Sequence, residues 1–185
     1  MADKALERPA ADFLHGCVRT EGLRGGWVRP WRVTARQRRV LSSITAWHPG
    51  EYRQMATCTS GISVELRTDA RVVELEVRVD PLPKHSADVL KWADIPLDAL
   101  VDGFSYDVDD HHVGPVMPGP GEHVLRFELF DPDESGSQAT LPGLGSLRTL
   151  RIWLPALRGC EVRNLRLQGE AHPVAPRPSL VVLDD

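Results

Sequence analysis

The sequence has few cysteines, and none of them has the spacing of a metal or disulfide framework. Cys17, Cys58 and Cys160 are odd in number and far apart, and no CxxC pair occurs. This pattern argues against a disulfide scaffold or a zinc knuckle and suits a reducing compartment. We therefore expect each cysteine to be a small buried side chain and the protein to be cytoplasmic.

Long apolar runs and an excess of charge of one sign are also missing. No stretch approaches the roughly 18 apolar residues of a membrane-spanning helix, and residues 1–16 lack the apolar segment of a secretory signal. The 22 Lys and Arg residues stand against 26 Asp and Glu residues, for a formal net charge of −4 without a basic stripe. We expect neither a membrane nor a nucleic-acid partner.

Sustained helical periodicity is absent, and apolar and polar residues instead alternate. The clearest run, RVVELEVRV at residues 71–79, places every second side chain on one face: Val73, Leu75, Val77 and Val79. Further alternating runs occupy residues 61–67, 123–130, 147–154 and 161–168. In the last of them Val162 is out of phase with Leu165 and Leu167, which indicates a β-bulge near Asn164.

Clusters of glycine and proline separate these runs. The clusters lie at residues 23–26, 48–50, 80–83, 118–121 and 131–146. Short alternating strands with such turns predict an all-β protein, an antiparallel β-sandwich of the jelly-roll kind, with little helix. The only helical candidates are residues 4–13 and 88–92. We expect an N-terminal arm at 1–17, the sandwich at 18–169, and a Pro-rich connector leading into a further domain at 170–185.

The segment DVDDHH, residues 107–112, is the one concentration of metal-ligand side chains. In an extended chain Asp107, Asp109 and His111 point to one side, where they suit a divalent cation. The alternative is a solvated loop or edge strand that these side chains keep polar. No second ligand cluster with a recognisable spacing occurs, so we expect no metal and no cofactor.

Motifs for nucleophilic catalysis are absent. The sequence has no GxSxG, no HExxH and no Gly-Asp-Ser block, Ser60 is typical of a turn, and His172 lacks an aspartate three residues before it. We therefore expect no catalytic residue in this chain.

Trp153 is the most interesting aromatic residue. Its neighbours in the alternation, Thr149 and Arg151, are polar, so the indole should face outward, where it can stack on a sugar or an acyl chain. The alternative is ordinary packing for the indole and simple solubility for Arg151. With these two we group Tyr106, Asp107, Asp109 and His111 as candidate contacts to a ligand or another domain.

Several segments, taken in order, resemble a known family. They are residues 56–79, with TSG before a strand and TDA after it, Asp102-Gly103 in LVDG, residues 121–130, residues 147–171 with IWLP, and Pro-Arg-Pro before an LVVL run. Together they resemble the N-terminal β-sandwich, or jelly-roll, domain of SGNH/GDSL-type hydrolases and acyltransferases. The resemblance extends over about residues 39–185.

The resemblance implies a binding role rather than a reaction. The family's catalytic domain begins with a strand ending in Gly-Asp-Ser; here Asp185 matches the Asp, Asp184 stands where Gly is usual, and the nucleophilic Ser would come next. It thus implies a non-catalytic accessory domain that helps a downstream catalytic domain bind a carbohydrate or acyl-ester substrate. On this interpretation we expect residues 172–185 to be poorly ordered or extended across a surface.

Two other functions stay open at this stage. One is a free-standing module that binds a carbohydrate or another protein. The other is a metal-dependent enzyme that uses Asp107, Asp109 and His111.

Overall fold

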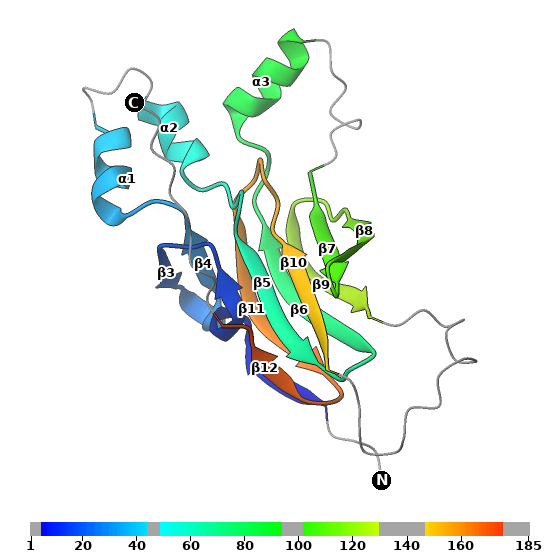
Figure 1. The fold of residues 1–185 in the computed structure, drawn as a ribbon. Helices are drawn as coiled ribbons and strands as arrows, with labels where there is room; N and C mark the ends of the chain where they lie inside the picture. Colours follow the sequence, from blue (N-terminus) through cyan, green and yellow to red (C-terminus); the bar gives the residue numbers. More distant parts are fainter. Residues whose placement is uncertain (1–4, 44–48, 94–101, 130–146, 176–185) are drawn as a thin grey trace, which may run out of the picture.

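Two antiparallel β-sheets make up the body of the protein. The computed structural model describes residues 5–43, 49–93, 102–129 and 147–175. Within them, the first sheet has the order β3 (Arg19–Gly22), β4 (Val28–Trp31), β11 (Cys160–Leu167), β6 (Val72–Val79) and β9 (Gly121–Glu128), with β1 (Leu6–Pro9) also paired to β11. The second has the order β12 (Ala171–Pro173), β5 (Ser63–Thr68), β10 (Arg148–Trp153), β7 (Phe104–Val108) and β8 (His111–Val116), with β2 (Leu14–His15) paired to β5 (Figure 1).

The alternating runs supply the core between the sheets. Side chains from both sheets join in one buried apolar cluster, and the largest of those fully buried include Phe104, Phe127, Leu75, Leu150 and Ile152. Each side chain of this size contributes about 1.5–3 kcal/mol when it leaves water. The predicted all-β, sandwich-like fold with little helix is confirmed.

The predicted bulge in β11 is confirmed as well. The register of β11 against β6 shifts between Val162 and Leu165. As a result Val162, Leu165 and Leu167 are all buried, although their spacing in the sequence does not follow a period of two. The extra residue at the bulge thus allows all three side chains to face the core, so that the apolar face of β11 is continuous.

The N-terminal segment contributes one short strand to each sheet. β1 pairs with β11, a 3-10 turn follows at Ala10–Phe13, and β2 pairs with β5. Phe13 is fully buried in the core. Within the segment 4–13, which was the N-terminal helical candidate, Leu6–Pro9 form a strand and Ala10–Phe13 a single 3-10 turn. Residues 6–15 of the expected arm therefore lie within the sandwich. Each piece is too short to show a periodicity.

In the described part of the chain three α-helices accompany the sheets, and Figure 1 shows them toward one end of the molecule. They are α1 (Ala35–Leu41), α2 (Pro49–Met55) and α3 (Lys84–Trp92). α3 includes the predicted residues 88–92, whereas α1 and α2 were not predicted. α1 does carry a start signal in the sequence, because Thr34 and Gln37 form a capping box. None of the helices in the described residues is long and apolar enough to cross a membrane.

β2 and β12 share one edge of β5. β12 pairs with Thr68 through Leu66, and β2 pairs with Val64 and Ser63. Because β2 occupies the next part of this edge, the chain cannot continue along it after Pro173. The start of the predicted connector therefore belongs to the second sheet, while residues 176–185 lie outside the described residues.

Replacement of Phe13 tests whether the N-terminal segment is part of the core. We expect Phe13→Ala to lower the free energy of unfolding by about 3–5 kcal/mol, because it leaves a cavity between the sheets. Val18→Ala, at an exposed site a few residues away, should change it by less than about 0.5 kcal/mol. Urea unfolding followed by circular dichroism measures both, and equal midpoints would show that the segment is dispensable.

Candidate functional site

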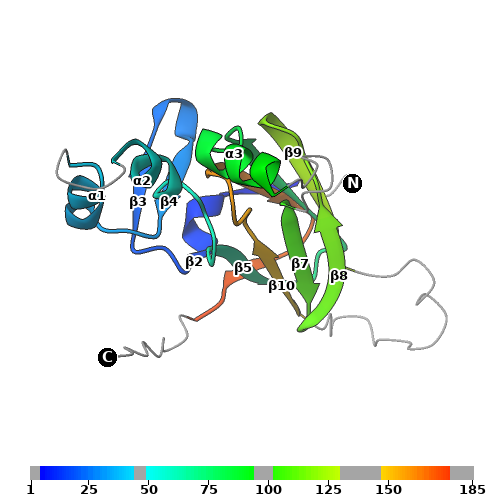
Figure 2. The ribbon, with the colours of Figure 1, turned by 90° about the horizontal axis from the view of Figure 1, so that it is seen from above.

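The outer face of the second sheet carries a polar cluster that includes three of the predicted site residues. Arg151 and Trp153 of β10 and Asp107 of β7 project from the face opposite the core. In the register of the sheet, Arg151 lies opposite Glu65 of β5 on one side and opposite Asp107 on the other. Figure 2 shows β5, β10 and β7 as neighbours in this sheet. The strands thus bring a cation between carboxylates.

Arg151 is the centre of this cluster and is only 8% exposed. Its Nε lies 3.2 Å from Oε1 of Glu65, and its Nη1 donates a 3.2 Å hydrogen bond to Oδ1 of Asp110. Nη1 is also 4.0 Å from Oδ2 of Asp107. A buried charge is tolerated only when it is paired, so Arg151 and Glu65 stabilise each other in this position.

Trp153 is fixed by the same cluster. Its Nε1 donates to Oδ2 of Asp107 at 3.2 Å, and the Arg151 guanidinium lies 5.7 Å from the indole ring centroid. The side chain is half-buried on the outer face, the side that the alternation indicates. An indole held by two neighbours is a preformed apolar surface, since little side-chain entropy remains to be lost on binding.

A cavity of about 260 Å³ lies beside Trp153. Trp153, Asp102, Gly103 and Ser105 are among the residues that line it. The lining thus includes an aromatic residue and a residue with a hydroxyl group, a combination suited to a small ligand with one apolar face.

Asp102 is the component of this cavity that sequence reasoning missed. It is buried, and its Oδ1 accepts hydrogen bonds from the backbone N–H groups of Ala156 at 2.8 Å and Leu157 at 3.0 Å. Its Oδ2 lies 3.4 Å from Nε of Arg158. The carboxylate therefore holds the loop after β10 against the start of β7. Its place in the Asp-Gly pair was a signal of a turn, and nothing local marked it as a cavity wall.

The remaining residues of segment 107–112 do not form a metal site. Asp109 and Asp110 have φ angles of 51° and 64° and form the tight turn between β7 and β8. Backbone in this region breaks the alternation that would have put Asp107, Asp109 and His111 on one side. Asp109 instead accepts the Thr149 N–H at 2.8 Å. In the described part of the chain, no group of three His, Cys, Asp or Glu side chains is placed to hold a metal ion.

Tyr106 lies on the opposite side of β7, inside the core. Its ring meets that of Phe127 edge-on, with centroids 5.1 Å apart, and burial raises the pKa of its hydroxyl. It is therefore not part of the outer-face cluster. The alternation of Phe104, Tyr106 and Val108 in FSYDV was the signal for this placement.

The cysteines have the character of packing residues. Cys58 and Cys160 are buried, Cys17 is partly buried, and burial raises the pKa of all three thiols. A raised thiol pKa lowers the fraction of the reactive thiolate at neutral pH.

Arg151→Met tests the importance of the buried charge pair. We expect the free energy of unfolding to fall by about 3–5 kcal/mol, because Glu65 is left buried without its cation. The double replacement Glu65→Gln with Arg151→Met should recover part of this loss. Arg126→Met, which removes an exposed arginine from β9, should cost no more than about 1 kcal/mol. Chemical denaturation of the unchanged chain and the three variants measures these free energies of unfolding. A loss of stability for Arg151→Met no larger than that for Arg126→Met would contradict the importance of the buried charge pair.

No protein-family model and no curated protein matches the chain. Solved structures do match. A salicylyl-acyltransferase, SsfX3, from a tetracycline biosynthetic pathway superimposes with a TM-score of 0.60 and 16% identity, over 95% of this chain and 43% of that chain. A protein from Bacteroides ovatus described as a GDSL-like lipase superimposes with a TM-score of 0.56 and 16% identity, over 91% of this chain and 42% of that one. The chain thus has the fold of somewhat less than half of each of these proteins.

Proposed function

We propose that the chain is the non-catalytic β-sandwich part of an SGNH/GDSL-type esterase or acyltransferase and helps the catalytic domain bind its substrate. The observation that carries this proposal is the unequal coverage of the structural matches. Nearly all of this chain corresponds to 43% of an acyltransferase and 42% of a GDSL-like lipase. More than half of each match has no counterpart in these 185 residues.

The path of the chain supports a catalytic domain that follows in the same polypeptide. β12 is the last described strand, and β2 blocks further pairing along β5 after Pro173. The LVVL run, which resembles the first strand of the catalytic domain, lies seven residues further on.

The outer face of the second sheet offers a surface on which this domain could bind part of the substrate. The cavity beside Trp153 has this aromatic residue and Ser105 in its lining. Contacts with parts of the substrate remote from the reacting bond lower the barrier when they position the ester or the acyl acceptor. The sandwich would thus supply binding and orientation to a carbohydrate or acyl-ester substrate, in a reducing, cytoplasmic setting.

A second candidate is a free-standing carbohydrate- or protein-binding module. The same cavity favours it, because an aromatic residue beside the hydroxyl-bearing Ser105 suits the apolar face and a hydroxyl group of a sugar ring. The two functions differ in whether a catalytic domain follows residue 185.

An esterase assay on the 185-residue chain tests the non-catalytic role. We expect hydrolysis of p-nitrophenyl acetate and butyrate to equal that of a heat-denatured sample, because the proposed nucleophile lies in the next domain. The reading frame after codon 185 is determined in parallel and should encode a serine followed by an α/β domain. Saturable hydrolysis that follows the folded chain through purification would overturn the non-catalytic role, and a stop codon would favour the free-standing module.

Replacement of Trp153 tests the substrate-binding role in the protein that includes the downstream domain. We expect Trp153→Ala to lower kcat/KM for its ester substrate about tenfold, which corresponds to about 1.4 kcal/mol, and Trp153→Phe to lower it less. Trp92→Ala is the matched control, because this indole on α3 is 90% exposed. Equal kcat/KM values for Trp153→Ala and Trp92→Ala would remove Trp153 from substrate binding.

A further inference from the structure

β9 is the longest strand at a sheet edge within the described residues. Only β6 pairs with it, and the register runs without a shift from Val72 opposite Glu128 to Val79 opposite Gly121. The other strands at sheet edges have at most four residues, except for β8, in which Pro115 has no N–H to donate. In this part of the chain, the free side of β9 is therefore the one long, unblocked place where a further strand can pair.

The free side of β9 carries the backbone groups of every second residue, from Glu122 to Glu128. The Leu129 N–H bonds to the Arg71 carbonyl, on the side of β6. Successive residues of a strand direct their N–H and C=O groups to opposite sides, so Leu129 and each second residue before it face β6. The residues between them have their N–H and C=O groups on the free side, where another strand can reach them.

The side chains of these same residues lie on the outer face of the first sheet. Val124 is 55% exposed and stands between Glu122 and Arg126, whose side chains are 59% and 61% exposed. Glu122 accepts both of its hydrogen bonds from Arg78 on Oε1, and Arg126 donates to Glu128 through Nε alone. Exposed pairs of this kind are weak, so both groups can take a further partner of opposite charge.

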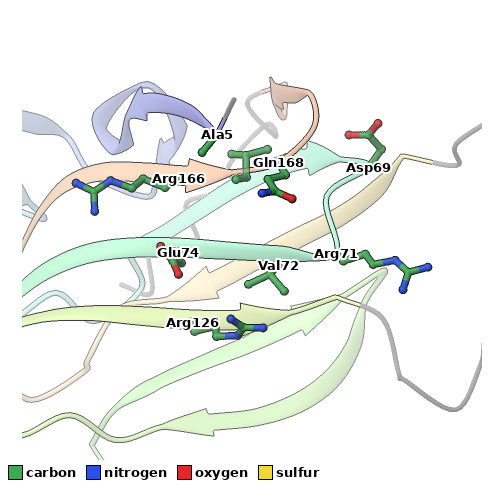
Figure 3. Close-up of a pocket in the computed structure, with 9 residues that line it drawn as sticks. Ala5, Asp69, Arg71, Val72, Glu74, Arg126, Arg166 and Gln168 are labelled. Carbon is green, nitrogen blue, oxygen red and sulfur yellow. The ribbon is translucent and has the colours of Figure 1, made fainter. Parts of the chain in front are cut away.

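Two rows of alternating charge cross the outer face of the first sheet and end on β9, on either side of Val124. The first row consists of Arg29 of β4, Glu161 of β11, Arg78 of β6 and Glu122 of β9. The second row consists of Glu7 of β1, Arg166 of β11, Glu74 of β6 and Arg126 of β9. Figure 3 shows the last three members of the second row on neighbouring strands. One row thus presents a carboxylate at the edge, and the other a guanidinium group.

We propose that a second copy of this chain pairs with β9 across a two-fold axis at Val124 and joins the two first sheets into one. Antiparallel pairing in this register places Val124 opposite its counterpart and Glu122 opposite Arg126 of the second copy, once on each side of the axis. Each row of charges then continues into the other row of the second copy, and the sign alternates at every step. A shift of the axis to Leu125 would instead bring Glu122 opposite Glu128, and like charges in direct opposition are destabilising.

The edge of β9 fits a second copy of itself. A contact across a two-fold axis requires a self-complementary surface, and the order Glu-x-Val-x-Arg at residues 122–126 has this property. A single pair of strands buries less surface than a standard interface, so the dimer forms reversibly and depends on protein concentration. The proposal is independent of the proposed function, because it involves neither Trp153 nor the downstream domain.

Sedimentation equilibrium of the full 185-residue chain measures this association. Over protein concentrations from about 1 μM to about 1 mM, we expect the average mass to rise from that of one chain toward that of two. The dimer should weaken as sodium chloride is raised, because the ion pairs across the axis are exposed to solvent. The mass of a single chain over the whole range would overturn the proposal.

Charge reversal on β9 tests the register. Arg126→Glu and Glu122→Arg each place like charges opposite each other on both sides of the axis, and we expect each to raise the dissociation constant by at least about tenfold. Arg36→Glu, at an exposed position on α1, is the matched control and should associate as the unchanged chain does. Equal association of Arg126→Glu and Arg36→Glu would contradict the contact.

A mixture of the two β9 variants separates repulsion at the edge from a defect in folding. In the mixed pair each reversed charge faces a reversed charge of opposite sign, and the unchanged Arg126 of one variant faces the unchanged Glu122 of the other. We therefore expect a heterodimer about as tight as the dimer of the unchanged chain, detected by sedimentation with a fluorescent label on one variant. No association in this mixture would rule out the register centred on Val124.

Val124→Lys supplies an independent variant of the same edge. Each new lysine lies beside Glu76 of its own chain, which suits the fold, but opposite another lysine on the two-fold axis. We expect this variant to sediment as a single chain under conditions in which the unchanged chain dimerises. Dimerisation equal to that of the unchanged chain would show that β9 is not the contact.

Discussion

The contact between the apolar inner faces of the two sheets determines what the rest of the molecule can do. Each strand has only two faces, so the choice of inward side chains also settles which ones face outward. Leu150 and Ile152 go into the core, and Arg151 and Trp153 must then project from the other side of β10. Val73 and Leu75 in β6 place Val72 and Glu74 outside in the same way. The outer surfaces of both sheets are therefore by-products of the core.

The outer faces are themselves partly closed, by arginines that cover carboxylates and indoles. Trp27 lies beneath Arg78 and Arg163, whose guanidinium carbons are 4.4 and 4.6 Å from its ring centroid. Glu161, only 4% exposed, is paired at 2.6 Å with Arg29 and at 2.8 Å with Arg78. Where the arginines cover these groups completely, the surface contributes to the stability of the fold. The cavity beside Trp153 and the hollow lined by Val72, Glu74 and Arg126 are places where this cover leaves space.

The sequence predicted the fold class because alternation reports burial directly. It also predicted the bulge in β11, since Val162 and Leu165 could be buried together only if the register shifted. It could not show that Phe13 is in the core, because a residue in a single turn belongs to no periodic run. Similarly, the outward position of Trp153 followed from its neighbours in the sequence. The position of Asp102 near Trp153, in contrast, depends on contacts between segments more than 50 residues apart. Such contacts leave no mark in a local pattern.

The shared edge of β5 has a consequence for how this protein is made. A ribosome delivers β2 and β5 early, whereas Ala171–Pro173 emerge more than 100 residues later. Until then only Val64 and Ser63 on that edge have a partner, and the backbone groups from Leu66 to Thr68 remain open to pairing with another chain. Completion of the second sheet is therefore a late event in synthesis, and a chain that stopped short of β12 would expose a strand edge suited to aggregation.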